Sequence, residues 1–160
     1  MKDEKERDAR EKMAEHLEQL QQEACYLVDL FPKRVPPDRS EAFWAAERFF
    51  LRGKEKRALQ RGFLRIMMQL ACYYPCRIWR EENGMDWREI PLEKIPKAVK
   101  DFEKDGCGEV QMLLETEDTL PILQEGTLCL MVYQPSQSVL QLLEVLAQAS
   151  GFFLRRAEEE

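Results

Sequence analysis

The sequence predicts an α+β fold in which a helical N-terminal part precedes a ferredoxin-like βαββαβ sandwich over about residues 76–156. Three observations lead to this prediction. Apolar residues keep a helical three-four spacing up to Pro75, and beyond it they form short alternating or continuous runs. The segments 76–81, 92–104, 110–116, 127–134, 136–150 and 151–156 then read as strand, helix, strand, strand, helix and strand. That order is the split βαβ repeat of ferredoxin-like sandwiches.

The first 31 residues divide into a highly charged segment and a segment with an apolar stripe. Residues 1–12 are almost wholly charged and have no apolar stripe, so we expect them to fray. The segment 13–31 is predicted to be a helix with one apolar seam, formed by Met13, Leu17, Leu20, Ala24, Leu27 and Phe31 at alternating four-three spacing. This seam either packs on the rest of the chain or pairs two copies as a short coiled coil.

Two more helices are predicted before Pro75. The prolines of the segment 32–37 end the first helix, and Ser40 is placed to cap a second one with an aromatic face. The third helix spans residues 54–74, and its apolar side consists of Leu59, Phe63, Ile66, Met67 and Leu70. Gly62 inside this helix costs about 1 kcal/mol relative to alanine, which predicts that a backbone or a large aromatic ring approaches it.

Both faces of the sheet are expected to be covered. The runs 110–114 and 128–133 are almost continuously apolar, whereas a strand with one wet face alternates. We therefore place the two C-terminal helices on one face and the three N-terminal helices on the other, where Phe43, Trp44, Phe50, Phe63 and Met67 would pack. This predicts a single domain over 1–160, in which the helical extension 13–74 stabilises the βαββαβ unit 75–160.

Composition narrows the class of protein. The 160-residue chain has no apolar run near the roughly 20 residues that cross a bilayer, and its net charge is -6. We therefore expect a cytoplasmic protein that binds neither membranes nor nucleic acid. Its five cysteines, an odd number at irregular spacing, are expected to stay reduced and to serve as small core residues, with Cys107 the most exposed.

The sequence contains no recognisable catalytic or metal-binding constellation. His16 is the single histidine and lies near the N-terminus, so a Cys-His dyad has no convincing member, and Cys72 and Cys76 have no second clustered pair that would complete a zinc site. The two glycines of 106–108 precede a strand rather than open a helix, unlike those of a phosphate loop. We expect no enzymatic activity, no cofactor and no metal; an enzyme that uses Cys107 or a carboxylate cluster is a third possibility.

Two features favour association with a protein. Residues 47–65 contain seven bases against two acids, and residues 103–125 contain seven acids against one base, so the chain either pairs with itself or solvates one helix face with its basic stretch. The turn 81–84 is flanked by tryptophans and arginines, the residue types enriched in binding hot spots. The candidate interaction surface consists of Arg77, Trp79, Arg80, Trp87 and Arg88. The alternative is that both tryptophans belong to the edge of the core.

The segments 26–32, 35–36, 42–51 and 70–74 together resemble a family of small uncharacterised proteins from Gram-positive, Clostridia-like bacteria. This resemblance covers about the first half of the chain, implies a bacterial cytoplasmic origin and contains no catalytic motif. The leading hypothesis is a non-enzymatic protein-interaction or regulatory module. The alternative is a small-molecule sensor for amino acids or nucleotides like the ACT domains, which share the βαββαβ order, with a pocket framed by 109–116 and 117–126.

Overall fold

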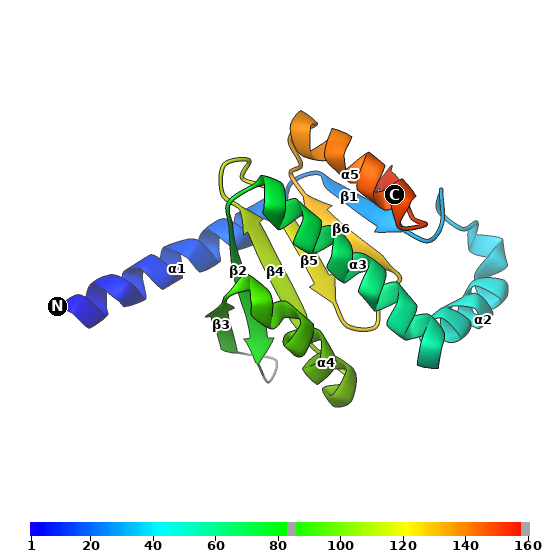
Figure 1. The fold of residues 1–160 in the computed structure, drawn as a ribbon, viewed down its shortest axis with the longest axis horizontal. Helices are drawn as coiled ribbons and strands as arrows, with labels where there is room; N and C mark the ends of the chain where they lie inside the picture. Colours follow the sequence, from blue (N-terminus) through cyan, green and yellow to red (C-terminus); the bar gives the residue numbers. More distant parts are fainter. Residues whose placement is uncertain (83–85, 158–160) are drawn as a thin grey trace.

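The computed structural model describes residues 1–82 and 86–157, which form an α+β fold around one seven-stranded sheet (Figure 1). In chain order the elements are α1 (Lys2–Leu20), β1 (Cys25–Asp29), η1 (Pro37–Arg39), α2 (Ser40–Phe50), α3 (Gly53–Tyr73), β2 (Cys76–Glu82), β3 (Asp86–Ile90), η2 (Leu92–Lys94), α4 (Ile95–Asp105), β4 (Glu109–Leu114), β5 (Leu120–Gln124), β6 (Cys129–Tyr133), α5 (Gln137–Ala149) and β7 (Phe153–Arg156). The strand order is β3-β2-β4-β5-β6-β1-β7, and every pair of neighbours is antiparallel.

The α+β class is confirmed, but the ferredoxin-like arrangement is not. Strands β1, β3 and β5 were not predicted, and each lies beside predicted strands. Because β3 and β4 are both antiparallel to β2, they are parallel to each other, and α4 connects them across β2. In the same way α5 connects β6 and β7 across β1. The strand between each connected pair is therefore supplied by an earlier segment of the chain.

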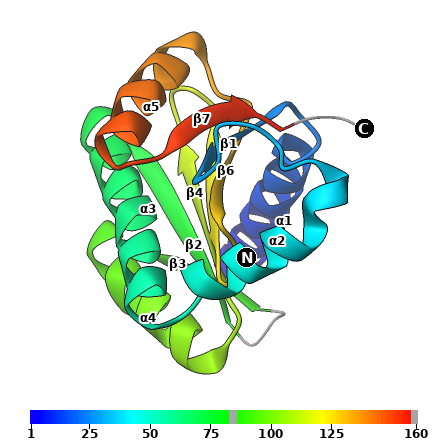
Figure 2. The ribbon, with the colours of Figure 1, turned by 90° about the vertical axis from the view of Figure 1, so that its right-hand side faces the viewer.

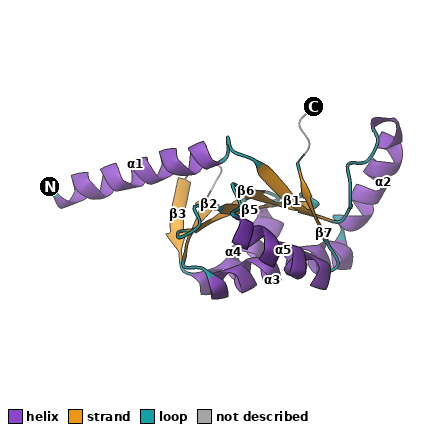
Figure 3. Cartoon of the chain, turned by 90° about the horizontal axis from the view of Figure 1, so that it is seen from above, coloured by secondary structure: helices purple, strands orange, loops and turns teal. Residues whose placement is uncertain are grey.

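One face of the sheet is covered by three helices, α3, α4 and α5, as Figures 2 and 3 show. A wide sheet needs several helices side by side, and α3 supplies the middle of this layer. The core between helices and sheet includes Phe63, Ile66, Met67 and Leu70 of α3, Val99 and Phe102 of α4, Val139 and Leu143 of α5, and Val28, Met112, Leu130 and Val132 of the sheet. The prediction that Phe63 and Met67 pack on the opposite face is therefore wrong.

Of the helices in the described part of the chain, α1 alone packs on the opposite face. Met13, Leu17 and Leu20 keep the predicted seam. They contact a second apolar cluster on the sheet that contains Trp79, Leu113, Leu120 and Ile122, with Met131 and Tyr133 at its border. His16 Nε2 lies 2.5 Å from Asp118 Oδ1 and ties the helix to the turn between β4 and β5. The seam thus packs in cis, and the predicted cover of this face is confirmed for α1 alone.

The predicted helix 13–31 is wrong beyond Leu20, because residues 25–29 form strand β1. This strand lies between β6 and β7 and hydrogen-bonds to both, so backbone pairing on two sides outweighs the helical spacing of this segment. Residues 2–12, expected to fray, continue α1 as an exposed helix that extends away from the sheet (Figure 1).

The predicted cap of the second helix is wrong: Ser40 is the first residue of α2, and no side-chain hydrogen bond caps that helix in the described part of the chain. A cap forms at the last helix, and the close aromatic approach to Gly62 is confirmed. Ser136 caps α5, since its Oγ accepts a hydrogen bond of 3.2 Å from the backbone N–H of Val139. A Cβ added to Gly62 would lie 2.7 Å from ring atoms of Phe152, which is the aromatic approach that this glycine predicted. The Phe152 ring in turn stacks on Phe63 with centroids 4.8 Å apart. Gly62 therefore lets α3 and the segment before β7 come into close contact.

Candidate functional site

Helix α2 is the least buried apolar element of the fold. None of its residues is buried, and it lies at the end of the molecule opposite the free end of α1 (Figure 1). Its inner side chains Phe43 and Phe50 only border the core, where the Phe43 ring lies 6.0 Å from that of Phe31. Trp44 and Phe49 are each 58% exposed. The predicted packing of Trp44 on the sheet is therefore wrong.

The outer face of α2 is both aromatic and basic. Trp44, Ala45, Arg48, Phe49 and Arg52 are all exposed and recur at helical spacing; we call these five residues the α2 outer face. Among the described residues neither of its arginines forms an ion pair. The face borders an open hollow of about 520 Å³ between α2 and the first turn of α3. It combines the aromatic and guanidinium groups that dominate binding hot spots.

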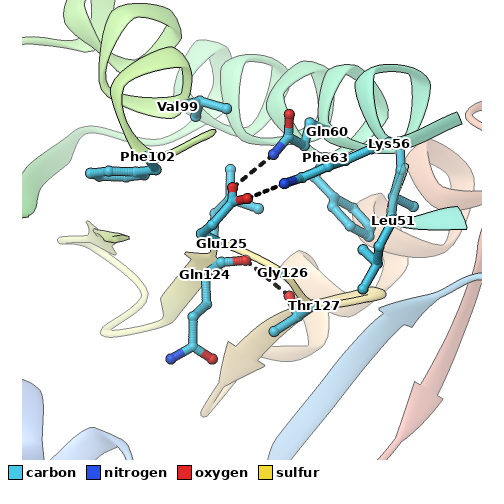
Figure 4. A pocket seen from close by; sticks show the side chains of 12 residues that line it. Leu51, Lys56, Gln60, Phe63, Val99, Phe102, Gln124, Glu125, Gly126 and Thr127 are labelled. Carbon is cyan, nitrogen blue, oxygen red and sulfur yellow. Dashed lines mark hydrogen bonds and ion pairs between the residues drawn. The ribbon is translucent and has the colours of Figure 1, made fainter. Parts of the chain in front are cut away.

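Lys56, four residues after Arg52, is used differently. Lys56 Nζ of α3 pairs with Glu125 Oε1 of the β5–β6 turn, and Gln60 donates a 2.9 Å hydrogen bond to the other carboxylate oxygen (Figure 4). The Glu125 side chain is only 4% exposed. At this point a base of the basic stretch thus pairs with an acid of the acidic stretch within one chain, and the pair fixes α3 to the sheet.

The cavity beside this cluster is too small for a ligand. It holds about 10 Å³, which is the space of a single water molecule. Figure 4 shows that apolar side chains such as Leu51, Phe63 and Phe102 surround it. We therefore assign the Lys56, Gln60 and Glu125 cluster to the stability of the fold.

On the α1 side of the sheet, no helix of residues 1–82 and 86–157 covers strands β6, β1 and β7 (Figure 3). Residues that are paired across neighbouring strands point to the same side of the sheet. Tyr133 of β6 borders the apolar cluster under α1, so its side chain marks the α1 side. The residues of β6, β1 and β7 that share this side are then identified by the strand register. Its partly exposed members are Cys25, Leu27, Cys129, Met131 and Tyr133, and Phe153 at the edge is 45% exposed. We call these six residues the open sheet face.

The charges at the open sheet face are partly neutralised. Asp29 is 5% exposed and accepts hydrogen bonds of 3.1 and 2.8 Å from Nε and an NH2 nitrogen of Arg155. Glu81 and Glu109 lie on the same side of β2 and β4, because they alternate with Arg80 and Val110 of the helix-covered side. Glu109 accepts a 3.0 Å hydrogen bond from the Gln111 amide. Burial raises the pKa of Glu109, and the charge of Glu81 raises it further.

The thiols and the phenol of the open sheet face are poor nucleophiles. Burial raises the pKa of Cys129 to about 11 and also raises the pKa values of Cys25 and Tyr133. A reactive cysteine needs a lowered pKa, because the thiolate is the attacking species. These groups are therefore protonated and uncharged at neutral pH, and they contribute to the open sheet face as weakly polar surface.

The five residues of the sequence-based interaction surface lie on two sides of the sheet. Arg77, Trp79 and Trp87 face the α1 side, whereas Arg80 and Arg88, which are paired in register, face α4. The Arg77 guanidinium donates two 2.9 Å hydrogen bonds to Glu89 and lies 5.1 Å from the Trp79 ring. These bonds lower the pKa of Glu89 and raise that of Arg77.

These five residues also differ in accessibility. Trp79 is 9% exposed and packs under α1, as the core-edge alternative proposed, while Trp87 is 46% exposed on the edge strand β3. Arg80 bonds to Asp101 at 3.1 Å and lies 5.3 Å from the Phe102 ring. Residues 83 and 84 of the predicted turn lie outside the described residues. The five residues do not form one continuous surface, and their role in binding stays a prediction.

Other chemistry finds little support in the described part of the chain. No cluster of three metal-ligating side chains occurs there, and no helix is long and apolar enough to cross a membrane. All five cysteines are free; Cys107 is exposed as predicted, Cys72 is also exposed, and Cys25, Cys76 and Cys129 are half-buried, so none of the five is the fully buried core residue that the sequence predicts. The two segments expected to frame a ligand pocket pair with each other as β4 and β5.

In comparisons with known proteins, no family model, no curated protein and no solved structure matches this chain.

The α2 outer face was not found by sequence reasoning, although its signal was visible. An aromatic stripe at helical spacing normally marks a core-facing helix. In α2 the aromatic residues are distributed around the helix, so Phe43 and Phe50 can contact the core only if Trp44 and Phe49 remain outside. The positions of all four aromatic residues around the helix, rather than their number, indicate that two of them stay exposed.

Proposed function

We propose that this protein is a non-enzymatic protein-interaction module and that the α2 outer face binds its partner. The observation that supports the proposal is an eleven-residue helix that has no buried residue and exposes a tryptophan and a phenylalanine, each 58%. Large exposed apolar side chains that lie together are typical of interaction sites.

The composition of the α2 outer face describes the surface that it would bind. Trp44 and Phe49 require an apolar partner surface that removes them from water. Arg48 and Arg52 favour carboxylates at the rim, where charge complementarity increases the association rate and excludes partners of the wrong charge. The proposed partner is therefore a protein surface that is apolar at its centre and acidic at its border.

A photo-crosslinking experiment tests this proposal. A benzophenone amino acid at Ala45, in the middle of the α2 outer face, is compared in the source cells with the same group at Gln148, an exposed position of α5. We expect a discrete crosslinked protein from Ala45 and none from Gln148. Equal products from both positions, or none from Ala45, would contradict the proposal.

Truncations identify the side chains that carry the binding. The variant Trp44→Ala/Phe49→Ala should retain at least tenfold less of the crosslinked partner, since two hot-spot side chains are removed. The matched control is Tyr73→Ala/Val145→Ala, which removes two apolar side chains that are 69% and 63% exposed on other helices. Equal loss of binding in both double variants would mean that the α2 outer face is not specific.

A further inference from the structure

The open sheet face has the properties required of the surface that α2 binds. Leu27, Met131 and Phe153 provide apolar surface on three adjacent strands. Glu81 and Glu109 provide carboxylates on the same side of the sheet. The buried pair Asp29 and Arg155 adds no net charge. The strand order places Glu109 on β4, which is separated from β6 by β5, and Glu81 on the next strand, β2. An apolar area with carboxylates further along the same side of the sheet therefore lies on the same chain that carries the aromatic and basic helix.

The two surfaces do not meet within one molecule. The α2 outer face is exposed, and the helix lies beyond one end of the sheet instead of over β6, β1 and β7 (Figures 1 and 3). The inner side of α2 is already in contact with Phe31 and the border of the core. A second copy is therefore the occupant whose charge and apolar surface complement both faces.

We infer that the protein self-associates by placing the α2 outer face of one copy on the open sheet face of another. Trp44 and Phe49 cover the apolar strands, while Arg48 and Arg52 approach Glu81 and Glu109. The inference rests on the proposed function, because it names the partner of the α2 outer face. The contact joins two different surfaces of the chain. When each of two copies places its α2 outer face on the open sheet face of the other, a symmetric dimer closes, whereas a contact made in one direction only is heterologous and extends into a ring or a chain.

Charge complementarity between two copies also explains why some charged side chains are paired within the described part of the chain and others are not. The Lys56 and Glu125 pair is satisfied within the chain, whereas Arg48 and Arg52 form no ion pair among the described residues. Glu109 is largely removed from water and receives a hydrogen bond from a neutral amide. An arginine from a second copy would supply the cation that this carboxylate lacks, and the surrounding apolar contact would strengthen the pair.

A charge-reversal experiment with internal rescue tests the inference. The mass of the purified chain is measured by sedimentation and light scattering up to about 100 µM, a range that detects dissociation constants of that size or tighter. We expect concentration-dependent association that is weakened about tenfold or more by Arg48→Glu/Arg52→Glu and equally by Glu81→Lys/Glu109→Lys. The chain that carries all four substitutions should associate again, because both charges of each contact are reversed.

Two further sets of variants keep this experiment decisive. The pair Arg48→Glu and Glu81→Lys, alone and combined, avoids the partly buried Glu109 in case its replacement disturbs folding. Lys97→Glu/Lys100→Glu reverses two exposed charges of α4 and should leave association unchanged. A wild-type chain that stays monomeric over the whole range, or a combined variant that is no better than either half, would overturn the inference. A foreign protein crosslinked at Ala45 to a monomeric chain would preserve the proposed function while excluding self-association.

Discussion

The face of the sheet that carries α3, α4 and α5 differs from the opposite face in how completely its apolar residues are covered. On the first face, Phe63, Ile66 and Met67 of α3 are at most 1% exposed. On the second face, α1 covers the strands nearest its seam, and Phe153 remains 45% exposed at the far edge. The two faces thus separate the surface that stabilises the fold from surface that is available for association.

The largest effect is expected on the covered face. Phe63→Ala removes a ring that is 1% exposed and stacks on Phe152 at 4.8 Å, so it should cost about 3–5 kcal/mol of unfolding free energy. That is a large share of a typical domain stability of about 5–15 kcal/mol. Urea unfolding followed by circular dichroism measures the loss. A loss below about 1 kcal/mol would mean that α3 is not central to the core.

A second effect is expected where α3 is fixed to the β5–β6 turn. Lys56→Met leaves the carboxylate of Glu125, which is 4% exposed, without its cation. Removing one member of a buried ion pair costs about 3–5 kcal/mol of unfolding free energy. Gln60 still donates its hydrogen bond to the Glu125 carboxylate, so we expect a loss near the lower limit, about 3 kcal/mol.

A double variant separates the ion pair from simple packing. Adding Glu125→Gln to Lys56→Met removes the unpaired charge and should recover more than half of the lost stability in the same urea titration. If the stability lost by the double variant equals the sum of the losses of the two single variants, the two side chains do not interact, and the assigned ion pair is wrong.

A smaller, pH-dependent effect is expected on β4, on the same side of the sheet as the open sheet face. Burial and the charge of Glu81 raise the pKa of Glu109, so the ionised form is less stable in the folded than in the unfolded protein. Glu109→Gln should therefore raise the melting temperature at pH 7. The gain should vanish below about pH 4, where the carboxyl is protonated in both states.

Measuring Glu109→Gln at both pH values separates the cost of the ionised Glu109 carboxylate from any general effect of a glutamine side chain at this position. Glu103→Gln, at an exposed position of α4, is the control and should change the melting temperature little at either pH. A gain for Glu109→Gln that is the same at both pH values, or a loss at pH 7, would contradict the assigned cause of the raised pKa.

The difference between the two faces also explains which elements could be predicted from the sequence. The apolar side of α3 is regular and fully buried, so its spacing identified both the helix and its core residues. Strand β3 was missed because it is polar and exposed at the edge of the sheet, where no alternation is imposed. Strand β5 was missed because Pro121 lies within it and lacks the N–H of a ladder donor.

The candidate site was less predictable for a physical reason. A periodic pattern shows which residues of a helix share a side, but it does not show whether another element covers that side. The aromatic residues of α2 were therefore assigned to a sheet face that the helix does not reach. The sequence-based surface was divided for a similar reason, because Arg80 and Arg88 alternate with Trp79 and Trp87 and so lie on the opposite side of the sheet.

The central claim is that the exposed aromatic side chains of α2 serve association and not folding. Urea unfolding of Trp44→Ala/Phe49→Ala tests this claim most directly, in dilute solution where association adds nothing to stability. We predict a free energy of unfolding within about 1 kcal/mol of the wild type, since both side chains are 58% exposed. A loss of several kcal/mol, comparable to that of Phe63→Ala, would show that α2 belongs to the core and would contradict the account.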